Sequence, residues 1–204
     1  EPTDYEMMAR ALNLATKGIY TSTPNPSVGC VITQNGKIVG EGYTKPVGGN
    51  HAEIEALSRI SDASDCCVYV TLEPCSHYGK TGPCAMALID AGVSRVVVAC
   101  EDPNPLVSGK GIKMLEEAGI GVDVGLLEDQ ARALNQGFIK RCEHGLPWVT
   151  IKMASSIDGR TAMASGQSQW VTTPDSRKDV QKLRAKSCAI ITGTVSYTHL
   201  RAHE

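Results

Sequence analysis

The sequence His51-Ala52-Glu53 is followed by Thr71-Leu72-Glu73-Pro74-Cys75 and then by Cys84. One imidazole and two thiolates form a common three-ligand set for zinc, with the fourth tetrahedral position open to water. The open position distinguishes a catalytic zinc from a structural one, and zinc lowers the pKa of bound water to roughly 7. These residues therefore predict a zinc site at His51, Cys75 and Cys84 that activates water near neutral pH.

Glu53 lies two residues after the predicted histidine ligand. A carboxylate at this place can take the proton of the water and deliver it to a leaving amine. The pattern H-x-E, followed by P-C and a second cysteine, is the signature of hydrolytic deamination at zinc. We therefore expect Glu53 to be the catalytic acid and base.

The flanking sequence predicts that two helices begin at this site. Residues i and i+2 point to different sides of a helix, so His51 and Glu53 can share a site only at a helix end. Pro83 is expected at the first position of a second helix, 84–91, which ends at Gly92. The partial positive charges of both N-termini would favour thiolate over thiol.

The chain has 204 residues and a net charge of −2, enough for one domain and part of another. A nucleic-acid-binding surface would need clustered basic residues, so we expect a small-molecule substrate and no nucleic acid. No apolar run approaches the ~18 residues of a membrane span, and no signal peptide opens the chain. The eight cysteines, in this setting, are typical of a reduced cytoplasmic protein.

The remaining pattern up to residue 146 alternates between helices and strands, which is typical of an α/β domain. The expected helices are 4–17, capped by Asp4, 109–118 and 128–140, besides the two at the site. The expected strands are 28–33 and 37–42, joined as a hairpin at Asn35-Gly36, and 67–72, 94–100 and 119–125.

A new pattern begins at Pro147. Residues 148–153 are expected to form a strand, 173–186 a helix with Pro174 at its first position, and 189–192 a second strand. This β-α-β unit is too short to bury a core of its own.

The chain resembles the bifunctional riboflavin-biosynthesis deaminase/reductases over roughly residues 4–194. Eight residues separate Cys75 from Cys84, whereas the cytidine and tRNA adenosine deaminases have a C-x-x-C pair. The resemblance implies a cytidine-deaminase-like three-layer α/β/α domain with a mixed five-stranded sheet, followed by the first β-α-β part of a dihydrofolate-reductase-like domain. The matching motifs are Pro24-Asn25-Pro26-Ser27-Val28-Gly29, His51-Ala52-Glu53, Thr71-Leu72-Glu73-Pro74-Cys75-Ser76-His77, Lys80-Thr81 with Cys84, Asp102-Pro103-Asn104-Pro105 and Ala154-Ser155-Ser156-Ile157-Asp158-Gly159-Arg160-Thr161.

For the first domain, the resemblance implies deamination of 2,5-diamino-6-(5-phosphoribosylamino)pyrimidin-4-one to the corresponding uracil. It implies substrate contacts for Asn25, His77 and Lys80, with Lys80 suited to the phosphate as a point charge. For the second part, it implies NADPH-dependent reduction of the ribosyl group. Ala154 and Trp170 match cofactor-contacting positions, Ser168 and Arg184 match substrate-contacting positions, and Lys152 is a weaker candidate.

Two places depart from the family pattern. Thr44 stands where a histidine is expected, which removes a titratable ring from a substrate contact. Residues 195–204 resemble translated vector sequence and include His199 and His203. We therefore divide the chain into a deaminase domain (1–145), an N-terminal fragment of the reductase domain (146–194) and a foreign tail (195–204). Deaminase activity without reductase activity is expected.

Two other functions remain open at this stage. The site could belong to a zinc deaminase that acts on another base, such as cytidine or tRNA adenosine. It could also be a structural zinc module, although such a module usually has four protein ligands. The sequence leaves open whether the chain forms a homo-oligomer.

Overall fold

The computed structural model describes residues 3–78, 82–105 and 107–192. The chain divides into two compact units, Glu1–Trp148 and Val149–Glu204. Each unit is described by itself below.

The first unit is built on one five-stranded sheet with the strand order β2-β1-β3-β4-β5. β1 pairs antiparallel with β2 and β3, whereas β3, β4 and β5 are parallel. This mixed five-stranded sheet confirms the fold expected from the sequence. The strands are β1 (Gly29–Gln34), β2 (Lys37–Tyr43), β3 (Cys67–Val70), β4 (Arg95–Val98) and β5 (Gly121–Val124).

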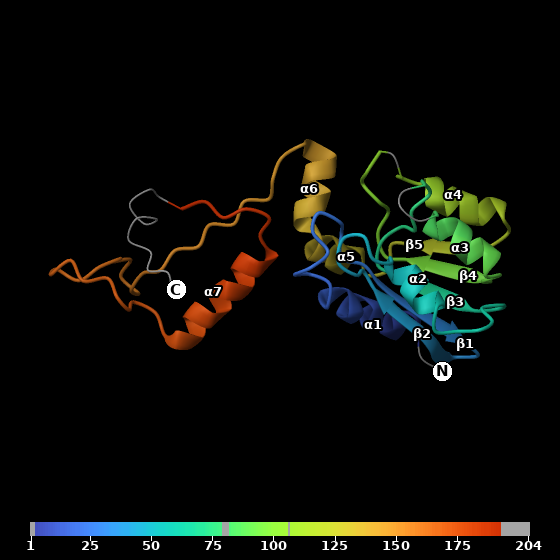
Figure 1. The fold of residues 1–204 in the computed structure, drawn as a ribbon, viewed down its shortest axis with the longest axis horizontal. Coiled ribbons are helices and arrows are strands. Elements are labelled where there is room, and N and C mark those ends of the chain that lie inside the picture. Colours follow the sequence, from blue (N-terminus) through green and yellow to red (C-terminus); the bar gives the residue numbers. More distant parts are fainter. Residues whose placement is uncertain (1–2, 79–81, 106, 193–204) are drawn as a thin grey trace. The chain divides into compact units, whose positions relative to one another are not determined.

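Helices cover both faces of the sheet and complete three layers (Figure 1). α1 and α5 lie on one face, and α2, α3 and α4 lie on the other. β1, β3 and β4 are central and almost wholly buried, because their alternating residues face one helix layer or the other. The helices are α1 (Asp4–Thr16), α2 (Ala52–Leu57), α3 (Cys84–Asp90), α4 (Lys110–Glu117), α5 (Glu128–Leu134) and α6 (Gln136–His144).

The hairpin between β1 and β2 forms as predicted. Asn35 and Gly36 both have positive φ angles, of 51° and 71°. A two-residue turn of this kind matches the twist of the strands it joins, and Asn-Gly is its preferred sequence. The turn leaves β2 at an edge of the sheet, next to α2.

Glycines on the sheet let two helix backbones approach unusually closely. A Cβ atom on Gly29 would lie 1.9 Å from the carbonyl oxygen of Ala11 in α1. A Cβ atom on Gly42 would lie 2.1 Å from the carbonyl oxygen of Ala52, the first residue of α2. A side chain at either position would clash with the helix backbone, so both helices can pack this closely only against glycine. Because α2 follows His51 directly, Gly42 sets the position of that residue.

Two helix predictions need correction. Thr3, not Asp4, caps α1, in a reciprocal capping box with Glu6. The single helix expected over 128–140 is two helices, α5 and α6, which meet at Asn135. Asn135 has φ −115° and ψ 28°, outside the helical region, because its side chain is engaged elsewhere in the fold.

The described part of the second unit contains one helix, α7 (Pro174–Lys186), capped by Thr173 as expected. The strands predicted over 148–153 and 189–192 do not form in this structure. Ile151 is 79% exposed and Ile191 97%, so neither segment has a sheet to pack against. The foreign tail predicted for 195–204, with His199 and His203, lies outside the described residues. No helix within the described ranges is long and apolar enough to cross a membrane.

Candidate metal centre

The three predicted zinc ligands come from three separate elements of the first unit. His51 is the residue before α2, with extended backbone angles of −72° and 164°. Cys75 lies in the loop that follows β3, and Cys84 is the first residue of α3. Pro83 is the N-cap residue of α3, whereas the sequence pattern predicts it at the first helical position. The loop after a parallel strand and the starts of two helices therefore meet at one place.

The donor atoms of these residues lie within 4.8 Å of one another. His51 Nδ1 is 3.7 Å from Cys75 Sγ and 3.3 Å from Cys84 Sγ. A tetrahedral zinc ion, with bonds of ~2.3 Å to sulfur and ~2.0 Å to nitrogen, separates such donors by about 3.5 Å. The residues thus fit zinc in both chemistry and spacing.

The local hydrogen bonds favour negative charge on the sulfur of Cys75. The backbone N–H of Cys84 donates to Cys75 Sγ over 3.3 Å. Hydrogen bonding with the Cys84 side chain, and then with His51 and the Cys84 backbone, lowers the pKa of the Cys75 thiol despite its burial. The same interaction and burial raise the pKa of the Cys84 thiol. A divalent cation bound by both sulfurs would favour the thiolate form of both residues.

Glu53 is buried beside this cluster, in the first turn of α2. Burial raises the pKa of its carboxyl group to about 7, and His51, Cys75 and Cys84 all contribute to its electrostatic environment. A group that exchanges a proton near neutral pH is suited to general acid and base chemistry. The structure therefore brings together all four residues that the sequence singled out at this site.

Asn25 is exposed, on a loop that a distant residue holds in place. The side chain of Asn135 accepts a hydrogen bond from the Ser27 N–H (2.8 Å) and donates one to the Ser27 carbonyl oxygen (2.9 Å). Arg141 donates to the Pro24 carbonyl oxygen over 3.4 Å. Sequence reasoning missed Asn135, because nothing in its own neighbourhood shows a partner 108 residues away.

His77 is exposed on the loop after Cys75, and Lys80 lies outside the described residues. Asp102, a residue to which the sequence assigned no role, is buried, and its carboxylate accepts a hydrogen bond from the Asn104 N–H over 2.8 Å. Burial raises the pKa of Asp102, while the hydrogen bond from the Asn104 N–H opposes that shift. The Asp102 N–H donates to Glu73 Oε2, in the loop after β3, over 3.1 Å. The loops after β3 and β4 thus meet at the carboxyl ends of parallel strands, where α/β sheets bind ligands.

Thr44, the departure from the family pattern, is buried, and its side chain is hydrogen-bonded to the backbone. Its Oγ1 accepts a hydrogen bond from the Val28 N–H over 2.9 Å, and its own N–H donates to the Val28 carbonyl oxygen over 2.9 Å. The hydroxyl is therefore committed to joining the end of β2 to the loop that carries Asn25.

In the second unit, Trp170 and Arg184 line one cavity of about 720 Å³, together with Lys152. The guanidinium of Arg177 lies 4.3 Å from the Trp170 ring centroid, within range of a cation–π interaction. Ala154 is half-buried and Ser168 exposed, and neither lines this cavity.

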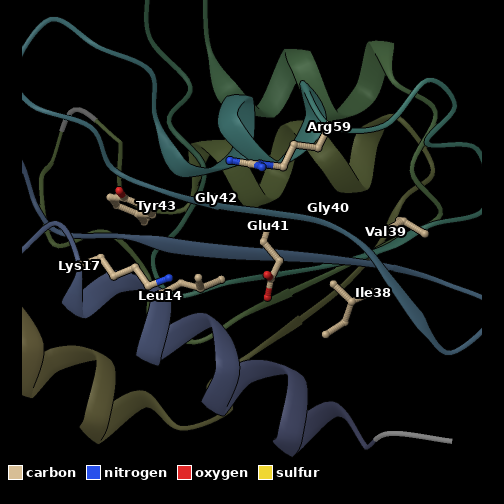
Figure 2. A pocket seen from close by; sticks show the side chains of 9 residues that line it. All are labelled: Leu14, Lys17, Ile38, Val39, Gly40, Glu41, Gly42, Tyr43 and Arg59. Carbon is tan, nitrogen blue, oxygen red and sulfur yellow. The ribbon is translucent and has the colours of Figure 1, made fainter.

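A separate cavity of about 390 Å³ lies along the edge strand β2 (Figure 2). Leu14 lines it from α1, Lys17 from the residue directly after α1, and Arg59 from the segment after α2. None of the four metal-centre residues lines it, so this cavity is distinct from the candidate site.

Two family models match the chain. "Cytidine and deoxycytidylate deaminase zinc-binding region" matches residues 2–100, and "RibD C-terminal domain" matches residues 147–202. The riboflavin biosynthesis protein RibD of Haemophilus influenzae is 58% identical over 189 residues, which are 92% of this chain and 51% of that protein. Over nine tenths of its own length, the chain is similar to RibD proteins.

Solved structures of the RibD family have the same fold. A structure of Acinetobacter baumannii RibD, form 2, is 52% identical with a TM-score of 0.90, covering 96% of this chain and 55% of that one. A Thermotoga maritima diaminohydroxyphosphoribosylaminopyrimidine deaminase/5-amino-6-(5-phosphoribosylamino)uracil reductase is 38% identical with a TM-score of 0.84, covering 89% and 52%. The chain spans about half the length of the curated relatives it matches.

Proposed function

We propose that the first unit catalyses zinc-dependent hydrolytic deamination of 2,5-diamino-6-(5-phosphoribosylamino)pyrimidin-4-one to 5-amino-6-(5-phosphoribosylamino)uracil. The observation that carries the proposal is the buried carboxylate of Glu53 beside a His51, Cys75 and Cys84 donor set that leaves a fourth tetrahedral position open. The Thermotoga maritima relative, whose name states this deaminase activity, supports the choice of substrate. The reaction would belong to riboflavin biosynthesis.

The chemistry assigns a separate task to each residue. His51, Cys75 and Cys84 would hold zinc, which supplies the Lewis acid that activates water when it is bound. The Glu53 carboxylate takes a proton from the attacking water and delivers it to the 2-amino nitrogen. The water oxygen bonds to the ring carbon that carries the amino group, the carbon–nitrogen bond breaks and ammonia leaves. The second proton of the water ends on a ring nitrogen, so a carbonyl remains on the ring. Burial of Glu53 keeps its proton exchange near neutral pH.

Substrate recognition falls to the loops around the metal centre. We assign Asn25 to the pyrimidine, since a rigid loop clamped by Asn135 fixes its backbone. His77 and Lys80, from the segment between the two cysteine ligands, are assigned to the phosphoribosyl group. A lysine ammonium is suited to phosphate as a point charge.

We propose that the second unit is an N-terminal fragment of a reductase domain, which in the full-length family protein would reduce the ribosyl group with NADPH. Ala154 and Trp170 are assigned to the cofactor, and Ser168 and Arg184 to the substrate. The cavity that Trp170 and Arg184 share supports this assignment. We keep the domain limits 1–145 and 146–194, with 195–204 as a foreign tail. All eight cysteines are free, which supports a cytoplasmic location.

The test is ammonia release from the diaminopyrimidinone phosphoriboside, with zinc counted in the protein. We expect Glu53→Ala to retain one zinc and to lose activity by ~10²-fold or more, the loss expected for a missing general acid and base. An active Glu53→Ala protein would contradict the assigned role. If the wild type binds zinc and releases no ammonia, the substrate is wrong, and cytidine, free bases and tRNA are tested next.

The reductase assignment is tested on the same polypeptide by an assay of NADPH oxidation. We expect no NADPH oxidation in the presence of the deaminated product, because the described part of the second unit has one helix and no sheet. Oxidation of NADPH would overturn this expectation.

A further inference from the structure

A buried carboxylate lies directly behind the cysteine-ligand loop. Glu73, two residues before Cys75, is 3% exposed. Its Oε2 accepts hydrogen bonds from the N–H groups of Asp102 (3.1 Å) and Gly109 (2.9 Å). Its Oε1 accepts from the N–H groups of Gly111 (2.8 Å) and Ile112 (3.3 Å). All four donors are backbone groups, and both oxygens are used.

Three of these donors belong to the start of α4 and the residue before it. The first N–H groups of a helix have no partner within the helix and carry partial positive charge. A carboxylate that accepts from them forms charge-assisted hydrogen bonds, which are roughly twice as strong as neutral ones. Glu73 therefore joins the first turn of α4 and the loop after β4 to the segment that carries Cys75.

The contact between α4 and this segment is too close to absorb movement. A Cβ atom on Gly111 would lie 2.0 Å from the carbonyl oxygen of Pro74 and 3.2 Å from Glu73 Oε1. Pro74 has a fixed φ angle, so the chain between Glu73 and Cys75 has little freedom. A shift of the Glu73 carboxylate would consequently be passed on to the Cys75 backbone.

The same segment is fixed on its other sides by backbone hydrogen bonds. The Glu73 N–H donates to the Cys100 carbonyl oxygen over 2.9 Å, which holds the segment to the end of β4. The Ala85 N–H donates to the Cys75 carbonyl oxygen over 3.1 Å, which holds its far end to α3. Glu73 supplies the side-chain anchor between these two points.

We propose that Glu73 is a positioning residue, which holds Cys75 Sγ at the separation from His51 and Cys84 that a metal ion requires. The proposal rests on the metal centre of the proposed function. It assigns Glu73 no contact with substrate or metal. Partners that orient a metal ligand tune affinity, and their loss typically costs 10–100-fold in metal binding.

The experiment compares Glu73→Gln with Glu101→Gln in the full chain. Glutamine retains one acceptor oxygen but turns an NH₂ group toward two backbone N–H donors. Glu101 is an exposed glutamate in the loop after β4, where its Oε1 accepts from the Ser108 hydroxyl over 2.9 Å, so it is a matched control. Metal affinity is measured by competition for Zn²⁺, and ligand geometry by the absorption spectrum of the Co²⁺-loaded proteins.

We expect Glu73→Gln to bind Co²⁺ and Zn²⁺ about 10–100-fold more weakly than wild type and to shift the cobalt absorption bands. Glu101→Gln should match wild type in both measurements. A Glu73→Gln protein with wild-type affinity and spectrum would overturn the proposal, whatever its thermal stability. The spectrum is decisive, because a residue that only stabilises the fold leaves the ligand geometry of the folded molecules unchanged.

Gly111→Ala is the second variant, and it replaces Glu73→Gln if that protein does not fold. It retains the Glu73 carboxylate but pushes α4 away from Pro74, so the same weaker binding and altered cobalt spectrum are expected. A wild-type spectrum would contradict the proposal. Ammonia release is recorded separately: a wild type that binds metal without releasing ammonia contradicts the proposed function, while the metal measurements still decide the role of Glu73.

Discussion

The two units of this chain carry similar apolar patterns but differ in what they bury. In the first unit, Val68 in β3 and Val96 in β4 are completely buried between two helix layers. In the second unit, no residue within 149–192 is buried, although 148–153 and 189–192 have the composition of strands. A strand-like sequence therefore becomes a strand only where a neighbouring strand edge and a covering helix are present.

This contrast also separates the two candidate sites. Glu53 and the metal-ligand set lie in α2, at the starts of α2 and α3 and in the loop after β3. The surrounding elements are closely packed, which holds functional groups precisely. Trp170 and Arg184 surround a cavity whose walls include exposed segments such as Ile190 and Ile191. The first site is therefore preorganised for chemistry, and the second is not.

Amide hydrogen exchange should give the largest difference between the units. Amides of β3 and β4 open only through global unfolding, which for a domain of ordinary stability (about 5 kcal/mol or more) implies protection of ~10⁴-fold or more. Amides of 149–153 and 189–192 should exchange within about tenfold of an unstructured peptide. Mass spectrometry of proteolytic fragments measures both in one sample. Equal protection in the two units would mean that the second unit has a sheet in solution.

A matched pair of leucine substitutions tests the same contrast energetically. Leu88 in α3 is completely buried, whereas Leu183 in α7 is 40% exposed. Leu88→Ala should lower the free energy of unfolding by ~2–5 kcal/mol, because it leaves a cavity. Leu183→Ala should change it by less than about 0.5 kcal/mol. Urea unfolding followed by circular dichroism gives both values, and a large effect of Leu183→Ala would show that α7 packs on a core.

The close contact between Gly42 and α2 predicts a smaller loss of stability. Gly42→Ala would place a Cβ atom 2.1 Å from the Ala52 carbonyl oxygen, so α2 must shift and carry His51 with it. We expect the free energy of unfolding to fall by ~1–3 kcal/mol, and zinc affinity to fall as well. Gly137→Ala in α6, where the nearest atom lies 3.9 Å away, is the control and should stabilise the protein by ~0.4–1 kcal/mol. Unchanged zinc affinity in Gly42→Ala would remove the proposed link between β2 and His51.

Local patterns in the sequence predicted the elements that depend on neighbours in the chain. The Asn35-Gly36 turn follows from residue types over a few positions. The mixed sheet was expected from the family resemblance and not from any local pattern. The meeting of His51, Cys75 and Cys84 could be anticipated because the chemistry of zinc requires it. The predictions of the turn and of the metal centre needed only local preference or a known coordination geometry.

Contacts between distant segments explain what the sequence did not reveal. Asn135 interrupts a predicted helix because its amide pairs with Ser27, and helix propensity cannot register that partner. The sequence likewise shows no role for the Glu73 carboxylate, because its hydrogen-bond donors lie 29 to 39 residues further along the chain. Both residues have hydrogen-bond partners that are distant in the sequence, so the periodic pattern of nearby residues does not reveal them.

The smallest expected difference is the pH dependence of two aspartates, one in each unit. In the first unit, hydrogen bonds from Arg95 (2.8 Å) and Tyr69 (2.7 Å) lower the pKa of Asp4. In the second, hydrogen bonds from Ser156 and Arg160 lower the pKa of Asp158, which is fully exposed. Since each folded-state pKa is depressed, any stabilisation is present above the unfolded value of about 3.9 and is lost as the pH falls through the folded value.

Asp4→Asn should therefore cost about 0.5–1 kcal/mol at pH 7, a value reduced by solvent screening because the Asp4 side chain is 42% exposed. The gap between wild type and Asp4→Asn should narrow as the pH is lowered through about 4 toward 2, since both proteins then lack the carboxylate. Asp158→Asn should follow wild type at every pH, because the second unit has no buried core whose unfolding the ion pair could oppose. Urea titrations at several pH values measure these differences. A gap for Asp4→Asn that stays constant with pH would assign its effect to lost hydrogen-bond geometry at the start of α1 rather than to the charge of the carboxylate.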